Sequence, residues 1–217
     1  MSGPTLQVMK EAVSRSLYSY WNNLRRDRIA PKRFEIEPSA IATYLPDTFI
    51  LERFDHATLR FRLAGTRISE AFGIEFRGLN LLDLFDAADV QILQRQIALI
   101  TSQGAVGVFR VAADSVAGLS AEFEIVLLPL THTREVVDRF LGSVAVVDRP
   151  SWLGTVALRR RKLIGHDIFW PDGRPRGLID DRERQTPFLP MVREARIVRS
   201  DRRQFRVYEG GRSGDER

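Results

Sequence analysis

The chain has 217 residues, of which 44% are hydrophobic and none is cysteine, and its formal net charge is +5. This length supports one well-formed hydrophobic core rather than two. The absence of cysteine excludes a disulfide framework, a zinc–thiolate site and any covalent chemistry that needs a thiol.

The first predicted element is an amphipathic helix within residues 1–30. Its apolar residues recur three or four positions apart and therefore share one face. They are Leu6, Met9, Val13, Leu17, Tyr20 and Leu24. The helix either folds over the outer face of the chain's own sheet or pairs with a second copy in a symmetric dimer. We expect a homodimer, with Tyr18 and Trp21 as anchors in the contact.

Residues 31–150 form the predicted domain, which begins with a hairpin and continues with helices. Residues 48–54 predict a strand, and the alternation of Leu59, Phe61 and Leu63 with polar residues predicts a second one with one buried face. A short helix follows Gly65 and ends at Gly73, and a longer helix spans residues 86–102, with Gly104 as its end. The apolar residues of the longer helix lie three and four positions apart and share one face across the sheet; they are Val90, Leu93, Ile97 and Ile100.

Three further strands are predicted at residues 105–111, 119–130 and 140–147, each an apolar or alternating run of strand length. The two hairpin strands and these three strands bury their apolar faces most simply in one five-stranded antiparallel sheet covered by helices. The predicted fold class is therefore α+β.

The order of these elements, together with several spaced residues, resembles the PAS fold. The run Arg62-Leu63-Ala64-Gly65-Thr66 leads into Phe72-Gly73-Ile74-Glu75-Phe76-Arg77-Gly78. Just upstream stand Trp21, Leu24-Arg25, Pro31, Ile36, Pro38 and Leu45-Pro46. This combination is similar to a bacterial PAS-containing family of the PAS_5 type, whose function is regulatory or unknown. The resemblance covers about residues 15–150.

The resemblance implies a sensory or regulatory protein that acts through protein interaction in bacterial signalling rather than as an enzyme. We expect no catalytic residues, because the 67 residues after Pro150 are too few for a kinase, cyclase or phosphodiesterase. The chain begins without a basic and then apolar leader, and it contains no run of eighteen apolar residues, so we expect a cytoplasmic protein.

A PAS fold implies a cup between sheet and helices, which holds either a small ligand or only its own side chains. The residues expected to face inward are Phe61, Leu63, Phe72, Leu93, Ile97, Phe109, Val111, Phe123 and Ile125. They shape an apolar cavity for a small apolar ligand or fill the core at ordinary density. Dense filling is the simpler interpretation, because any core shows such periodicity.

The identity of a cofactor stays open. A cysteinyl-flavin photosensor is excluded because the chain has no cysteine. Haem is disfavoured, because the resemblance implies an axial histidine on the long helix and none falls there. His56 lies in a predicted turn, His132 in a predicted loop, and His166 beyond the domain. No metal site is predicted, since the densest acidic cluster, at residues 180–183, alternates with arginine.

Residues 151–217 are predicted to be a basic, irregular extension, disordered toward the end. Up to Asp148 there are 16 Lys and Arg against 18 Asp and Glu, whereas from Arg149 onward there are 17 against 10. The basic residues include Arg159, Arg160, Arg161, Lys162, Arg202, Arg203 and Arg206. An alternative function is therefore binding of nucleic acid or an anionic lipid surface through this tail, with the domain as a dimerising scaffold.

Overall fold

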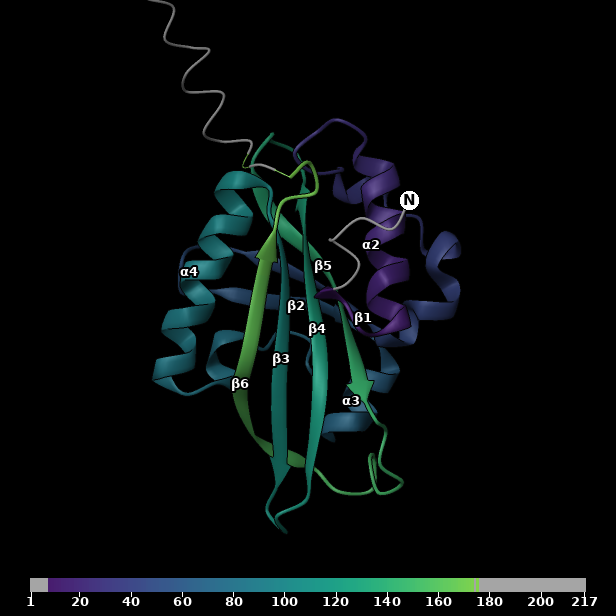
Figure 1. Cartoon of the computed structure of the whole chain (residues 1–217), viewed down its shortest axis with the longest axis vertical. Helices are drawn as coiled ribbons and strands as arrows, with labels where there is room; N and C mark the ends of the chain where they lie inside the picture. Colours follow the sequence, from purple (N-terminus) through teal and green to yellow (C-terminus); the bar gives the residue numbers. More distant parts are fainter. Residues whose placement is uncertain (1–7, 174, 176–217) are drawn as a thin grey trace, which may run out of the picture. The chain divides into compact units, whose positions relative to one another are not determined.

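The computed structural model describes residues 8–173 and residue 175 (Figure 1). The chain divides into two units, Met1–Arg184 and Gln185–Arg217, and all described residues belong to the first. Within them, six strands form one antiparallel sheet in the order β2-β1-β5-β4-β3-β6. The strands are β1 (Thr48–Arg53), β2 (Leu59–Ala64), β3 (Val106–Ser115), β4 (Ser120–Thr131), β5 (Val137–Val147) and β6 (Leu158–Phe169).

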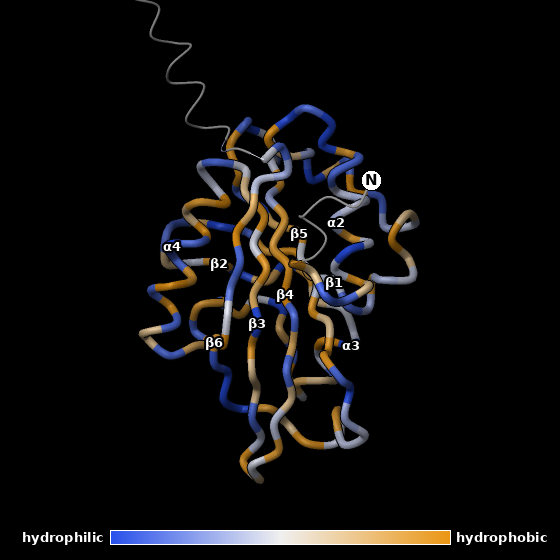
Figure 2. The backbone as a smooth tube through the Cα atoms, in the orientation of Figure 1, coloured by the Kyte–Doolittle hydropathy of each residue, from blue (hydrophilic) through white to orange (hydrophobic). Residues whose placement is uncertain are grey.

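Helices cover both faces of this sheet. The helical segments are α2 (Ala12–Arg25), η1 (Arg33–Glu35), η2 (Pro38–Asp47), α3 (Thr66–Phe72), η3 (Leu82–Leu84) and α4 (Ala87–Gln103). Along β4, Phe123 and Ile125 point to the face covered by α3, η3 and α4, whereas Glu124 points to the face covered by α2. We call the first the inner face and the second the outer face. Apolar residues run along the second half of β4 between these two layers (Figure 2).

The glycines that end the two inner helices have the backbone that a helix end favours. Gly73 follows α3 with φ of 66°, and Gly104 follows α4 with φ of 63°. Both are left-handed conformations that glycine adopts at little cost. The stripe on α4 buries Leu93, Ile97 and Ile100 against the sheet, as its spacing predicts.

α2 is fixed to the outer face along its whole length. Before its first turn, the buried Glu124 carboxylate accepts hydrogen bonds from the amides of Lys10 and Glu11, at 2.7 and 3.1 Å. Near its end, the Trp21 indole donates to the Pro129 carbonyl at 2.7 Å. The buried Arg25 forms an ion pair with Asp172 beyond β6, at 2.6 Å.

The prediction of a five-stranded sheet is wrong, because β6 adds a sixth strand. It lies within residues 151–217, which were predicted to be irregular, and it pairs along almost all of β3, from Val106 opposite Phe169 to Ser115 opposite Leu158. The four consecutive basic residues at 159–162 interrupt the alternation of apolar and polar residues that would predict a strand. Only Leu158 and Leu163 are fully buried, and the cations between them take the other positions.

The prediction that Leu63 faces inward is also wrong, since the side chain is 44% exposed. Leu51 pairs with Phe61 and Ile50 with Leu63, so Arg62 is an extra residue in β2. Such a bulge shifts the alternation by one position, and every side chain after it changes face. Phe61 before the bulge stays buried, and Leu63 after it turns to solvent.

The N-terminal helix is shorter than its apolar stripe, because α2 begins at Ala12. Met9 and Leu17 are buried in the chain's own core, and Val13, Tyr20 and Leu24 are half-buried. Leu6 lies outside the described residues. No helix in the described part of the chain combines the length and apolar character needed to cross a bilayer.

Candidate functional site

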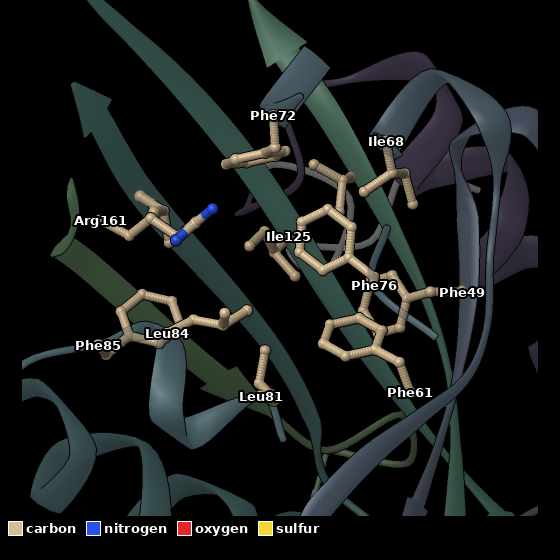
Figure 3. Close-up of a pocket in the computed structure, with 12 residues that line it drawn as sticks. Phe49, Phe61, Ile68, Phe72, Phe76, Leu81, Leu84, Phe85, Ile125 and Arg161 are labelled. Carbon is tan, nitrogen blue, oxygen red and sulfur yellow. The ribbon is translucent and has the colours of Figure 1, made fainter. Parts of the chain in front are cut away.

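An apolar cavity lies between the inner face of the sheet and the segment from α3 to η3. We call it the aromatic cup (Figure 3). Its lining residues are Phe49, Phe61, Ile68, Phe72, Phe76, Leu81, Leu84, Phe85, Val111, Ile125, Val144 and Arg161. The free volume is about 30 Å³, room for about two water molecules. The rings therefore fill most of the cup, and a larger guest needs the lining side chains to move.

The phenyl rings of the cup pack mostly edge to face or tilted. The ring centroids of Phe49 and Phe61 are 5.5 Å apart, those of Phe61 and Phe76 5.1 Å, and those of Phe72 and Phe76 5.5 Å. Phe72 also stacks on the buried Phe123 at 4.6 Å. These are favourable geometries for aromatic pairs, so the rings form one continuous wall.

Among the described residues that line the cup, Arg161 is the only charged one. It stands on β6 opposite Ala113, and its guanidinium points toward the cavity between Phe72 and Ile125 (Figure 3). The guanidinium carbon lies 5.1 Å from the centre of the Phe72 ring. Burial, and more weakly the neighbouring Arg159, lowers the pKa of Arg161 below its ordinary value.

The polar contacts of Arg161 are few. One terminal nitrogen donates to the Leu158 carbonyl at 3.2 Å, and the buried Nε has no hydrogen-bond partner. Among residues 8–173, the guanidinium forms no ion pair with a carboxylate. A guanidinium carries five N–H donors, so most of the Arg161 donors make no hydrogen bond to the described protein residues.

A surface groove of about 490 Å³ adjoins the cup at the β6 edge of the sheet. Its lining residues are Asp83, Leu84, Phe85, Asp86, Asp114, Arg159, Arg160, Arg161 and Lys162. Leu84, Phe85 and Arg161 line both the groove and the cup. The guanidinium therefore stands at the boundary between an apolar cavity and a charged groove with one more cation than carboxylates.

A second cavity, of about 160 Å³, lies between the cup and the start of α2. Ile68 and Val144 line both cavities, and Glu11 and Val13 line only the second one. The Asp47–Arg67 ion pair, at 2.6 Å, stands at its wall. Ile68 and Val144 thus separate the cup from a cavity that reaches the start of α2.

The nine residues predicted to face a ligand occupy three kinds of place. Phe61, Phe72, Val111 and Ile125 line the cup. Leu93, Ile97, Phe109 and Phe123 are buried in the surrounding core and do not line it, and Leu63 is exposed. The periodicity of strands and helices marks burial, and it does not distinguish a lining residue from a packed one.

Eight lining residues were not predicted. Four of them lie between α3 and α4, on η3 or in the irregular chain around it, where no regular period marks the inward positions; they are Phe76, Leu81, Leu84 and Phe85. A cluster of large apolar residues on both sides of Gly78 was the available signal. Arg161 was missed because its run of cations indicates a solvated tail rather than a strand.

The three histidines lie away from the cup and are exposed. His56 lies in the β1–β2 turn, His132 follows β4, and His166 is on β6 with its Nε2 3.2 Å from Gln96 Nε2. Residues 8–173 also contain no group of three His, Cys, Asp or Glu side chains arranged to hold a metal ion. Of the basic tail, Arg159, Arg160 and Lys162 are exposed on β6, whereas Arg202, Arg203 and Arg206 lie outside the described residues.

Comparisons with known proteins place the fold in a family. No curated protein matches the chain. Among solved structures, a PAS domain of an HTR-like protein from Haloarcula marismortui is 19% identical, with a TM-score of 0.34, over 49% of this chain and 92% of that one. The PAS_5 family model, described as a PAS domain, matches residues 9–145, which is more than half of the chain. The chain therefore belongs to the PAS domain family, whose members generally have sensory or regulatory roles.

Proposed function

We propose that this chain is a regulatory PAS protein that binds a small apolar molecule in the aromatic cup and reports it through α2 to a protein partner. The observation that carries the proposal is the cup itself. Eleven of its twelve lining residues are apolar, and they meet around a cavity between the sheet and α3. Pockets for small molecules in proteins have this character, with few polar groups among apolar and aromatic walls.

Two neighbouring residues of β4 connect the cup to the start of α2. Ile125 lines the cup on the inner face, and Glu124 holds the amides of Lys10 and Glu11 on the outer face. A guest that displaces Ile125 also moves the backbone that positions Glu124. The start of α2 then changes its contacts, and a partner that recognises α2 in one state binds differently in the other.

The test compares two variants that enlarge an isoleucine. Ile125→Phe fills the cup, whereas Ile92→Phe adds the same group to a half-buried position on α4 that does not line the cup. The full chain and both variants are analysed by native mass spectrometry for a retained small molecule, and by thermal unfolding with 1-hexanol as a neutral apolar probe. We expect the wild type and Ile92→Phe to bind, and Ile125→Phe to lose binding. Equal behaviour of all three proteins contradicts the proposal.

The same mass spectra report the subunit count, which bears on the predicted homodimer. Met9 and Leu17, which were expected at a dimer contact, are buried in the chain's own core. Dimerisation through α2 therefore stays a prediction that relies on the half-buried Val13, Tyr20 and Leu24.

Binding of nucleic acid or anionic lipid is the weaker alternative. Arg159, Arg160 and Lys162 are exposed, but Asp83, Asp86 and Asp114 line the same groove and reduce its positive potential. The first proposal is the better supported one.

A further inference from the structure

We infer that Arg161 is the anchor for an anionic head group, and that the ligand of the cup is a small amphipathic carboxylate. This inference rests on the proposed function, and it adds the chemical class of the ligand. The head group would lie at the Arg161 guanidinium, on the side of the groove, and the apolar part would enter among the phenyl rings.

The position that Arg161 occupies is energetically costly for a cation. A charged group withdrawn from water is unfavourable unless it is paired or hydrogen-bonded. The Nε of Arg161 is buried without a partner, and the carbonyl of Leu158 receives the one hydrogen bond that the side chain donates. The contact with the Phe72 ring replaces only part of the lost hydration. An apolar residue would fill this place at lower cost, so the cation has a role that packing does not explain.

The Arg161 side chain points in a different direction from those of its two neighbours on β6. Strand alternation sends Arg160 and Lys162 toward the outer face, and sends Arg161 to the inner face opposite Ala113. The three neighbouring cations are exposed, whereas Arg161 enters the wall of the cup. The pleat of the strand therefore separates Arg161 from Arg160 and Lys162, its two neighbours in the run.

The position of the Arg161 guanidinium, between an apolar cavity and a groove, suits the carboxylate group of an amphipathic ligand. The guanidinium has a planar fork of N–H donors that binds the two oxygens of a carboxylate side by side. Its neighbours in the shared wall, Leu84 and Phe85, are apolar, so a bound molecule meets a cation at one end and carbon at the other. The groove of about 490 Å³ has room for the head group, and the cup of about 30 Å³ limits the apolar part to a small chain or ring unless the phenyl rings move.

The experiment uses pairs of probes that differ in charge and not in shape. Hexanoate is compared with hexanamide, and phenylacetate with phenylacetamide, by isothermal titration and thermal shift on the full chain. We expect each acid to bind about 10- to 100-fold more tightly than its amide, because a charge-assisted, bidentate contact is lost in the amide. Binding of the acids is expected to weaken as sodium chloride is added.

Three variants connect the effect to one side chain. Arg161→Met keeps the length of the side chain and removes the charge, so the acids should bind no better than the amides. Arg161→Lys keeps the charge without the planar fork and should bind with intermediate affinity. Arg160→Met removes the neighbouring cation that faces away from the cup, and it should leave the preference for acids unchanged.

The outcomes separate this inference from the function on which it rests. If acids and amides bind equally well to the wild type and to Arg161→Met, the cup binds apolar molecules and the role of Arg161 is overturned. If Arg160→Met loses the preference as fully as Arg161→Met, the charge of the groove and not Arg161 selects the ligand. If no probe binds to the wild type, both the inference and the proposed function are overturned.

Discussion

Replacement of Trp21 by alanine tests whether α2 is an integral layer of the domain. The Trp21 side chain is fully buried, its indole donates to Pro129, and the Arg25 guanidinium lies 5.6 Å from the ring centre. The substitution removes the largest fully buried side chain of the described core. A cavity then forms between helix and sheet.

The expected loss in the free energy of unfolding is about 3–5 kcal/mol, the range for replacement of a buried aromatic residue by alanine. A domain of this kind has a total stability of about 5–15 kcal/mol, so the variant loses about a fifth or more of it. Trp21→Phe keeps most of the apolar contact and loses the indole N–H. We expect that variant to lose about 1–2 kcal/mol.

Urea unfolding followed by far-ultraviolet circular dichroism is the appropriate assay. Tryptophan fluorescence is unsuitable, because the substitution removes one of the three tryptophans of the chain. The control is Phe34→Ala, an aromatic residue that is 70% exposed, for which we expect less than about 1 kcal/mol. A loss below about 1 kcal/mol for Trp21→Ala would refute the packing of α2 on the outer face.

Two further predictions concern the close packing of the sheet and one ion pair. A Cβ atom at Gly142 would overlap the Phe49 ring and lie 2.6 Å from the Val126 carbonyl oxygen, so Gly142→Ala should lower stability by about 1–3 kcal/mol in urea unfolding. Phe49→Leu in the same chain should recover part of this loss, and a neutral Gly142→Ala would contradict the geometry. For the ion pair, the hydrogen bond from Arg28 holds the pKa of Glu35 below its ordinary value. The pair then stabilises the fold above the pKa that Glu35 has in the unfolded chain, and this contribution is lost as pH falls through the lower folded pKa. Both side chains are partly exposed, so Glu35→Gln should cost at most about 1 kcal/mol at pH 7 and clearly less at pH 3. A cost that is equal at both pH values would show that the carboxylate charge contributes nothing.

The sequence predicted those parts of the fold in which burial follows a regular period. The stripe on α4 and the caps at Gly73 and Gly104 are examples, because helix ends and helix faces leave local signals. The bulge at Arg62 was not predictable, since the extra residue depends on the pairing of β2 with β1, and no residue type demands it. It reversed the expected direction of Leu63.

The site was less predictable than the fold for two physical reasons. Phe76, Leu81 and Phe85 reach the cup from an irregular segment, so their inward direction is set by tertiary packing rather than by period. Arg161 faces inward only because β6 pairs with β3, a contact between distant parts of the chain. In the sequence, its run of cations is typical of a solvated surface.

The place of Arg161 in the chain limits what the family match says about the ligand. The stretch that identifies the chain as a PAS domain ends at residue 145, and Arg161 lies beyond it, on the last strand of the sheet. The stretch that identifies the family and the side chain proposed to bind the head group thus lie in separate parts of the polypeptide. A substitution at position 161 leaves the matched stretch unchanged, so two relatives with equally good matches over that stretch need not respond to the same molecule.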